Sequence, residues 1–332
     1  MTLVKFFYIF EWYVRRVKGS MGVKKEVLVY LSHSHVEAWN FLPFHRDLLE
    51  NLVPGLKVSV CQNSKEFLDQ LPEAEMVVVW FFKQNWLEKA NNLKLIATPA
   101  AGKDWINLDN SKINVWYGAF HGPMVAESII GAVFYFLKAF QYSKKMQSQR
   151  KWARVKISEC LGSLQASRVT IFGFGAIGQC LGKFLKPYGC TITGIKRTSA
   201  KIPDYFTEGD SIVGPDNISE VLGTTDHLIL TLPGGEKTEG LLTHELLCEL
   251  PSSCYLYNIG RGNVYQENDL VALLQGGELA GAYLDVFATE PLSENSRLWQ
   301  LDNVLLTPHI SAVSPQYLEL FVKELAGRIK SI

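Results

Sequence analysis

Residues 168–178, with the sequence RVTIFGFGAIG, constrain the fold of this chain more than any other stretch. The first five residues have the apolar character of a short buried strand, and residues 179–188 continue at the spacing of a helix. Between them Gly173, Gly175 and Gly178 form the pattern G-x-G-x-x-G. In such a turn the first glycine permits the tight bend, the second lets a pyrophosphate approach the backbone, and the third allows close packing of helix on strand. The stretch therefore predicts a dinucleotide-binding unit, with an ordinary glycine-rich turn as the alternative.

Strand and helix patterns alternate on both sides of this unit. Before it, strands are expected at residues 26–31, 57–61, 76–80 and 93–98. After it, strands are expected at residues 190–195, 211–213, 227–232, 254–259, 280–286 and 304–307. A long helix is expected over about 121–149 and a closing helix over 314–332. This alternation predicts an α/β protein with two doubly wound parallel sheets.

The composition excludes several functional classes. A length of 332 residues suggests about two domains. Lys and Arg together number 33, as do Asp and Glu, so no basic surface for nucleic acid is expected. The six cysteines have neither C-x-x-C nor metal-ligand spacing, which indicates a cytoplasmic protein with reduced thiols and no metal site.

The first 22 residues are interpreted as an N-terminal extension. Residues 3–14 are apolar and aromatic, but Lys5 and Glu11 interrupt them. The segment is shorter than the roughly 20 residues that span a bilayer, and it lacks the small-residue cleavage site of a secretory signal. We expect either an additional helix or a translation start upstream of Met21. A membrane-surface anchor is the alternative.

Three polar side chains follow neighbouring strands near the end of the chain. Arg261 lies in NIGRG, Glu290 in LDVFATEP and His309 in TPHI. An arginine can grip a carboxylate with two hydrogen bonds, and a histidine can exchange a proton near neutral pH. A glutamate beside the histidine orients it and favours its protonated form. Together these residues suit hydride transfer to a 2-keto acid.

With these motifs the chain resembles the D-isomer-specific 2-hydroxyacid dehydrogenases, in particular those of the glyoxylate/hydroxypyruvate reductase type, from about residue 26 to residue 328. The matching pieces are the turn AAGKD at 100–104, VAE at 125–127, the G-x-G-x-x-G, the Leu232-Pro233 turn with Thr238, NIGRG, LDVFATEP and TPH. Their order along the chain makes the resemblance specific.

The resemblance implies roles for particular residues. Arg261 would bind the substrate carboxylate and polarise the carbonyl, His309 would be the general acid/base, and Glu290 would pair with His309. Backbone amides of Ala101 and Gly102 would also hold the carboxylate, and Asp285 would contact the nicotinamide amide. The further cofactor contacts that it implies are Ala176, Ile177, Leu232, Pro233, Thr238, Ile259 and Gly260, in addition to the three fingerprint glycines.

The resemblance also implies an architecture in which a Rossmann cofactor domain, residues 122–307, is inserted into a flavodoxin-like substrate domain, residues 23–121 and 308–332. It further implies a homodimer built partly through the long helix near Val125.

The end of the second cofactor strand departs from the pattern of NAD enzymes. An acidic residue about 20 positions beyond the fingerprint would accept hydrogen bonds from the ribose 2′-hydroxyl. Lys196 stands there instead, followed by Arg197 and Thr198, which would attract a 2′-phosphate. We therefore expect NADP to be preferred over NAD, and an enzyme that accepts both is the alternative.

The expected function is reduction of small 2-keto acids by NAD(P)H. The alternatives are a nucleotide-sensing corepressor on the same fold, and a formate dehydrogenase-like enzyme, whose chemistry has no carbonyl that needs an acid pair.

Overall fold

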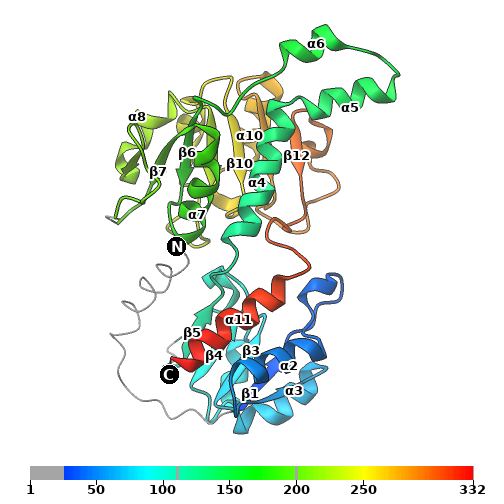
Figure 1. The fold of residues 1–332 in the computed structure, drawn as a ribbon, viewed down its shortest axis with the longest axis vertical. Coiled ribbons are helices and arrows are strands. Elements are labelled where there is room, and N and C mark those ends of the chain that lie inside the picture. The colour runs from blue at the N-terminus through cyan, green and yellow to red at the C-terminus, as the bar shows by residue number, and fades with distance from the viewer. Residues whose placement is uncertain (1–25, 110–111, 199–200, 332) are drawn as a thin grey trace, which may run out of the picture. The chain divides into compact units, whose positions relative to one another are not determined.

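The computed structural model describes residues 26–109, 112–198 and 201–331. The expected extension over residues 1–22 lies outside these described residues. The chain divides into two compact units. The described residues up to Phe120, together with those from Ser314 onward, form the first unit, and His121–Val313 form the second. Each unit is built on one sheet (Figure 1).

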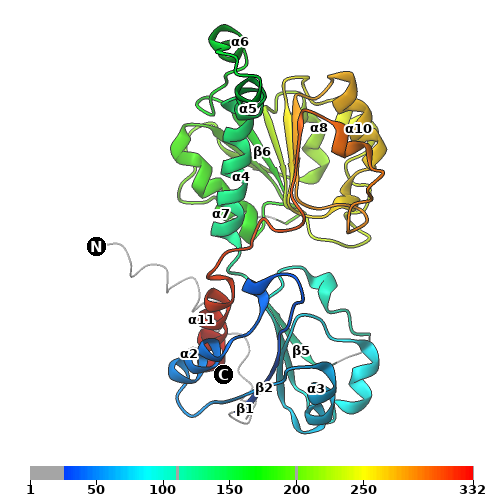
Figure 2. The ribbon, with the colours of Figure 1, turned by 90° about the vertical axis from the view of Figure 1, so that its right-hand side faces the viewer.

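The first unit contains a five-stranded sheet in the order β2-β1-β3-β4-β5, in which all neighbours are parallel. Its strands are β1 (Glu26–Tyr30), β2 (Lys57–Val60), β3 (Met76–Val79), β4 (Leu95–Thr98) and β5 (Asn114–Tyr117). Its α-helices are α2 (Pro43–Leu52), α3 (Ser64–Gln70) and α11 (Tyr317–Lys330). Figure 2 shows α2 and α11 on one face of this sheet and α3 on the other. Because both faces are covered, every residue of β3 and β4 is buried.

The sequence analysis did not predict the edge strand β5. It lies at the end of the sheet, and its four residues are exposed or only partly buried. Its apolar run, residues 115–117, is only three residues long and lies between Asn114 and Gly118, so it is shorter than the run MVVVW at residues 76–80.

The closing helix α11 belongs to the first unit, although it comes last in the sequence. It begins at Tyr317 rather than at residue 314. The Tyr317 hydroxyl donates to the Pro99 carbonyl at 3.4 Å, and the Ala119 amide donates to Glu324 Oε2 at 3.0 Å. The second unit is thus inserted into the first, and the predicted fold class of two parallel α/β units is confirmed.

The second unit contains a seven-stranded parallel sheet in the order β12-β11-β10-β9-β6-β7-β8. Its strands are β6 (Arg168–Phe172), β7 (Thr191–Ile195), β8 (Ser211–Val213), β9 (His227–Leu230), β10 (Tyr255–Asn258), β11 (Gly281–Leu284) and β12 (Val304–Leu306). Its α-helices are α4 (Gly122–Leu137), α5 (Phe140–Ser148), α6 (Arg154–Glu159), α7 (Ala176–Leu185), α8 (Ile218–Leu222), α9 (His244–Cys248) and α10 (Glu267–Gly276).

Two hydrophobic cores lie on opposite faces of this second sheet. Along β9, the side chains of Leu228 and Leu230 pack with residues of α8 and α10, whereas Ile229 packs with residues of α4 and α7. Figure 2 shows the two helix pairs on the two sides of the strands. Alternate residues of a strand point to opposite faces, so burial on both faces explains why these strands are apolar throughout.

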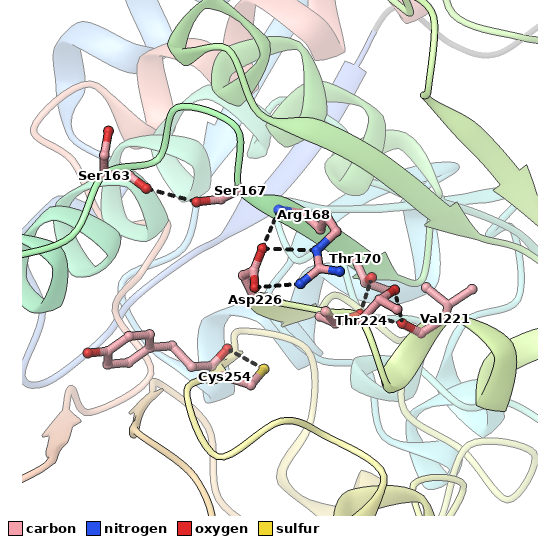
Figure 3. A network of polar contacts seen from close by, with 10 residues as sticks. Ser163, Ser167, Arg168, Thr170, Val221, Thr224, Asp226 and Cys254 are labelled. Atoms are coloured by element: carbon pink, nitrogen blue, oxygen red, sulfur yellow. Dashed lines mark hydrogen bonds and ion pairs between the residues drawn. The ribbon is translucent and has the colours of Figure 1, made fainter.

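An ion pair joins the amino ends of β6 and β9. Asp226, just before β9, accepts hydrogen bonds from the backbone amide of Arg168 at 2.8 Å and from its guanidinium at 3.1 and 3.2 Å (Figure 3). Close by, the hydroxyls of Thr170 and Thr225 are 2.7 Å apart inside the unit. These contacts fix the register of β6 against β9, and the glycine turn leaves the opposite end of β6.

The prediction of a single long helix over residues 121–149 is wrong. The helix ends at Leu137, Ala139 adopts a left-handed conformation with φ of 49°, and α5 continues at an angle of 60° to α4. The carbonyl of Leu137 accepts a hydrogen bond from the Gly162 amide at 2.8 Å, and Lys138 Nζ donates to the Gly162 carbonyl. A segment distant in sequence thus binds the helix end, which no local glycine or proline marks.

The boundaries of the inserted unit also differ from the expected ones. The sequence placed residues 308–332 in the substrate domain, but the backbone contacts place the chain up to Val313 in the second unit. His309 is therefore part of the same compact unit as the glycine turn. This location follows from its hydrogen bonds to β11, described below.

Within the part of the chain that the structure describes, no single helix is long and apolar enough to cross a membrane, and only the bent pair of α4 and α5 meets that criterion jointly.

Candidate active site

The glycine turn between β6 and α7 has the geometry that a dinucleotide phosphate requires. Gly173 has a φ of 106°, a conformation that residues with a side chain rarely adopt. A Cβ atom on Gly178 would lie 2.8 Å from the Gly173 carbonyl oxygen, so a side chain there would push the helix off the strand. A Cβ atom on Gly175 would meet nothing closer than 3.9 Å, which leaves the turn open on that side.

The first turn of α7 supplies the groups that an anion would contact. Ala176 and Ile177 open the helix, where backbone N–H groups have no acceptor within the helix and the helix dipole is positive. Together with the open face of Gly175, these amides fit a pyrophosphate. The residues present therefore suit the cofactor that the sequence predicts.

The basic residues of the second cofactor strand lie at its carboxyl end. The Lys196 amide donates to the Val213 carbonyl at 3.0 Å, so the backbone is still tied to the sheet at this point. The Lys196 side chain is half-buried, and those of Arg197 and Thr198 are exposed. Two cations and a hydroxyl thus follow β7, next to the glycine turn after β6 in the sheet order.

The segments that follow β9 and β10 pack against each other. A Cβ atom on Gly260 would lie 2.6 Å from the Leu232 carbonyl oxygen, so only glycine allows this approach. The Thr238 hydroxyl donates to the carbonyl of Pro233 at 2.7 Å and closes that turn. The Ile259 amide donates to the Leu230 carbonyl at 3.2 Å. The predicted cofactor residues of these two segments are therefore brought together.

Glu290 and His309 form a hydrogen-bonded pair. His309 Nδ1 lies 2.8 Å from Glu290 Oε2, and the Phe287 amide donates to Glu290 Oε1 at 3.0 Å. Burial opposes ionisation of Glu290, but the hydrogen bonds from His309 and Phe287 and the charges of His309 and Arg261 outweigh it, so the pKa of Glu290 is lowered. The carboxylate is thus ionised at neutral pH and occupies one nitrogen of the ring, which leaves Nε2 for a substrate.

Asp285 is wholly buried behind this pair and holds the loop of His309. Its carboxylate accepts hydrogen bonds from the Thr307 hydroxyl at 2.6 Å and from the amides of Ile310 and Ser311, both at 2.9 Å. Its backbone carbonyl accepts from the His309 amide at 2.8 Å. A nicotinamide contact of Asp285 stays a prediction, whereas the structure places its carboxylate among the loop amides.

Arg261 follows β10 and lies within electrostatic reach of Glu290. Its charge contributes to the lowered pKa of that carboxyl, and its guanidinium Nη1 donates to the Gly260 carbonyl at 2.8 Å. Since β10, β11 and β12 are neighbours in the sheet, the segments that carry Arg261, Glu290 and His309 emerge from adjacent carboxyl ends. The arrangement places a cation, a carboxylate and an imidazole in one unit, where they can bind an anion and transfer a proton.

The remaining predicted site residues belong to the first unit. Ala101 and Gly102 follow the carboxyl end of β4, where the Thr98 hydroxyl accepts a hydrogen bond from the Ala100 amide at 3.2 Å. Gly102 then precedes a short 3-10 helix, Lys103–Trp105.

Three residues that support the site were not identified from the sequence. Asn258 and Tyr265 are buried around the turn that carries Arg261, and Thr307 bonds to Asp285. The sequence did contain a signal for Asn258, which ends a buried strand two positions before a glycine. A polar residue in such a place commonly bonds to the backbone of the following turn. No sequence signal singled out Tyr265.

Comparison with known proteins extends these observations. The sequence profile of the D-isomer specific 2-hydroxyacid dehydrogenase, NAD binding domain, matches residues 130–311. Glyoxylate/hydroxypyruvate reductase A of Salmonella paratyphi B is 32% identical over 193 residues, which cover 58% of this chain and 59% of that protein. The match therefore spans less than two thirds of the length of such curated relatives.

Solved structures match over most of the chain. A D-isomer specific 2-hydroxyacid dehydrogenase from Xanthobacter autotrophicus Py2, in complex with NADPH and MES, is 26% identical with a TM-score of 0.77, covering 92% of this chain and 95% of that one. A probable 2-hydroxyacid dehydrogenase from Rhizobium etli CFN 42, in complex with NADP, HEPES and L(+)-tartaric acid, is 26% identical with a TM-score of 0.73, covering 92% and 94%.

The profile match covers more than half of the chain, and the inserted arrangement of two parallel-sheet units agrees with these structures. The chain therefore belongs to the D-isomer specific 2-hydroxyacid dehydrogenase family.

Proposed function

We propose that this protein reduces small 2-keto acids to D-2-hydroxy acids with a nicotinamide cofactor. The observation that carries the proposal is the His309–Glu290 pair. Glu290 follows β11, which is next to the strand β10 that precedes Arg261, and His309 follows β12 on the other side of β11. A cation for the carboxylate and an imidazole for the carbonyl oxygen are the groups that this reaction requires from the protein. Family membership supports the same chemistry.

In the proposed mechanism, the protein binds, orients and supplies a proton. The glycine turn and the first amides of α7 would hold the cofactor phosphates, and Asp285 and the segment after Pro233 would hold its nicotinamide end. Arg261 binds the substrate carboxylate. When bound, the cofactor would supply the hydride that the carbonyl carbon accepts. His309 donates a proton from Nε2 to the carbonyl oxygen, and Glu290 stabilises the cationic ring. Positioning and electrostatic polarisation provide most of the acceleration.

Glyoxylate and hydroxypyruvate are the first substrates to test. The Salmonella proteins that match 58% of this chain are glyoxylate/hydroxypyruvate reductases, and both keto acids have small side chains. We expect purified protein to oxidise NADPH in the presence of glyoxylate or hydroxypyruvate. A panel that adds pyruvate and larger 2-keto acids, run with NADH and NADPH, defines the substrate class. Absence of turnover with every acid and both cofactors would contradict the proposal.

We further propose NADPH as the preferred cofactor. Lys196 and Arg197 lie at the carboxyl end of β7, where an acid would repel a 2′-phosphate and a cation attracts it. Two relatives with 26% identity were solved with NADPH and with NADP.

The Arg197→Ala variant should lose about 10- to 100-fold in kcat/KM for NADPH, the range for a lost charge-assisted hydrogen bond, and little for NADH. Arg297→Ala, at an exposed arginine of the same unit, is the matched control. A wild-type preference for NADH would overturn this choice.

We also propose that the protein forms a homodimer, but through α5, α6 and the loop between them. The helix near Val125, which the sequence predicted as the interface, is packed in the core of the second unit at that residue. Figures 1 and 2 show these helices projecting away from the sheet of the second unit. Only Met146 is buried in α5, and α6 has no buried residue. Trp152 is 87% exposed, and Phe140, Val155 and Leu161 are also exposed. Apolar side chains gathered on a projecting segment are typical of a surface that a second subunit covers.

A further inference from the structure

The turn that carries Arg261 is packed tightly on two sides. A Cβ atom on Gly260 would lie 2.6 Å from the Leu232 carbonyl oxygen, and one on Gly262 would collide with the Phe287 carbonyl carbon. The backbone therefore passes between the segment after β9 and the segment that leads to Glu290. Such packing limits the path of the turn but does not by itself fix the orientation of its peptide groups.

Asn258 supplies that orientation from the end of β10. Its side chain has no exposed surface, and it bonds to both ends of the Gly260–Arg261 dipeptide. Oδ1 accepts from the Gly260 amide at 3.0 Å, and Nδ2 donates to the Arg261 carbonyl at 2.9 Å. Because one partner only donates and the other only accepts, the orientation of the Asn258 amide group is determined.

Tyr265 completes this small network. The second proton of Asn258 Nδ2 is donated to the Tyr265 hydroxyl at 3.2 Å. Burial raises the pKa of Tyr265 far above its ordinary value, despite the hydrogen bond from Asn258, so the phenol stays neutral. A neutral hydroxyl can accept this bond at any physiological pH, and it takes the Nδ2 proton that the turn does not use.

The network reaches the guanidinium through one more hydrogen bond. Arg261 Nη1 donates at 2.8 Å to the carbonyl of Gly260, which belongs to the peptide between the two groups that Asn258 holds. A rotation of this peptide would move the carbonyl to which Nη1 donates.

We propose that Asn258 is a positioning residue for Arg261: it fixes the Gly260–Arg261 peptide, and through the Gly260 carbonyl it aims the guanidinium at the substrate carboxylate. This inference rests on the proposed keto-acid reduction. It assigns to Asn258 and Tyr265 a part in substrate recognition, although neither side chain needs to touch the substrate.

The Asn258→Asp variant tests the proposal with little change in size. The carboxylate keeps the acceptor for Gly260 but places an oxygen against the Arg261 carbonyl, where Nδ2 donated. We expect kcat/KM for glyoxylate at saturating NADPH to fall by about 10- to 100-fold, mainly through a higher KM, as for loss of a buried hydrogen bond. The Tyr265→Phe variant keeps both contacts of Asn258 with the turn, so it should lose no more than about 5-fold.

Asn303→Asp is the matched control. Asn303 is a half-buried asparagine of the same unit, and its Nδ2 donates to the Leu274 carbonyl at 3.2 Å, away from the glycine turn and Arg261. It should lower the thermal unfolding midpoint without raising the KM for glyoxylate. An Asn258→Asp protein that folds and has a KM within 2-fold of wild type would overturn the proposal.

A double-mutant cycle separates positioning from general loss of structure. If Asn258 acts through Arg261, then Asn258→Asp should change kcat/KM by less than about 2-fold in an Arg261→Ala background. The same cycle with Asn258→Ala, which removes both bonds to the turn, keeps the test available if Asn258→Asp fails to fold. An equal loss in both backgrounds would show that the network does not act through Arg261 and would overturn the proposal.

Failure of the proposed function has a different signature. If the wild type reduces no keto acid, hydrogen exchange of the Gly260 amide still tests the network. In Asn258→Ala this amide loses its acceptor, and we expect its exchange to become at least about 10-fold faster, which corresponds to loss of one buried hydrogen bond. Unchanged exchange would overturn the role of Asn258 independently of activity.

Discussion

At the scale of the residue, His309 shows how neighbouring groups maintain an unfavourable backbone conformation. Its φ of 54° lies in the left-handed region, which costs a residue with a side chain about 1–3 kcal/mol. The loop tolerates this strain because Asp285 binds it at several points: its carbonyl accepts from the His309 amide, and its carboxylate accepts from Thr307, Ile310 and Ser311. The ring is then oriented by Glu290.

The corresponding prediction concerns proton transfer. In the His309→Ala variant, kcat for keto-acid reduction should fall by about 10²- to 10⁴-fold, the usual contribution of a general acid. Binding of NADPH, measured by fluorescence titration, should persist because the glycine turn is untouched. His244→Ala, an exposed histidine on α9, is the control. A near-normal kcat in His309→Ala would exclude this residue as the acid.

How far the sequence predicts individual contacts depends on their distance along the chain. The roles of Gly173 and Gly178 follow from local backbone geometry, and the structure has the turn that their spacing predicts. The bonds of Asn258 reach only two and three residues ahead, so an asparagine before a glycine was a usable signal. Asp285 bonds to residues beyond the next strand, and this pairing depends on the sheet order, which a single sequence does not contain.

At the scale of the element, prediction succeeded where a strand or helix is covered on both sides. The strands β3, β4 and β9 are buried at every residue, and their apolar runs mark them clearly. The errors fall where a long-range contact decides the outcome. The edge strand β5 has little burial to reveal it, and the end of α4 at Leu137 depends on a hydrogen bond from Gly162.

The strand β9 leads to a prediction about stability and pH. His227 is buried, 3.0 Å from the Tyr257 hydroxyl, and burial lowers its pKa to about 4 despite the charge of Asp226. Between pH 6.5 and 4 the unfolded chain binds a proton at this position and the folded chain does not, so the free energy of unfolding decreases as pH falls. From pH 7 to pH 5 the loss should be about 2 kcal/mol.

The measurement is urea unfolding at pH 7 and pH 5 for the wild type and for His227→Gln. The variant should be less stable at pH 7, but the difference between the two pH values should shrink by about 2 kcal/mol. His244→Gln, at an exposed histidine, should leave the wild-type difference unchanged. If His227→Gln showed the full wild-type dependence on pH, other groups would have to cause it.

At the scale of the whole molecule, the inserted arrangement distributes the proposed functions between two units. The second unit contains the glycine turn, Arg261, Glu290 and His309, whereas Ala101 and Gly102 follow β4 in the first unit. The sequence gives this division through the order of its motifs, since A-x-G-x-D precedes the glycine fingerprint and TPH follows it. It does not give the second boundary correctly, because the bonds of His309 to Asp285 keep its loop in the second unit.

The assembly proposed above can be tested on one exposed residue. Trp152 is 87% exposed on the segment between α5 and α6, and Arg154 lies over its ring at 5.9 Å. If a second subunit covers this surface, Trp152→Glu should weaken the dimer by at least about 30-fold, since removal of a buried interface tryptophan costs about 2 kcal/mol or more. Light scattering at micromolar concentration should give twice the chain mass for the wild type and a single chain mass for the variant. Trp299→Glu is the control, because Trp299 is 56% exposed in the same unit but far from this segment along the chain. A monomeric wild type would refute the dimer, and a dimeric Trp152→Glu would show that the interface lies elsewhere.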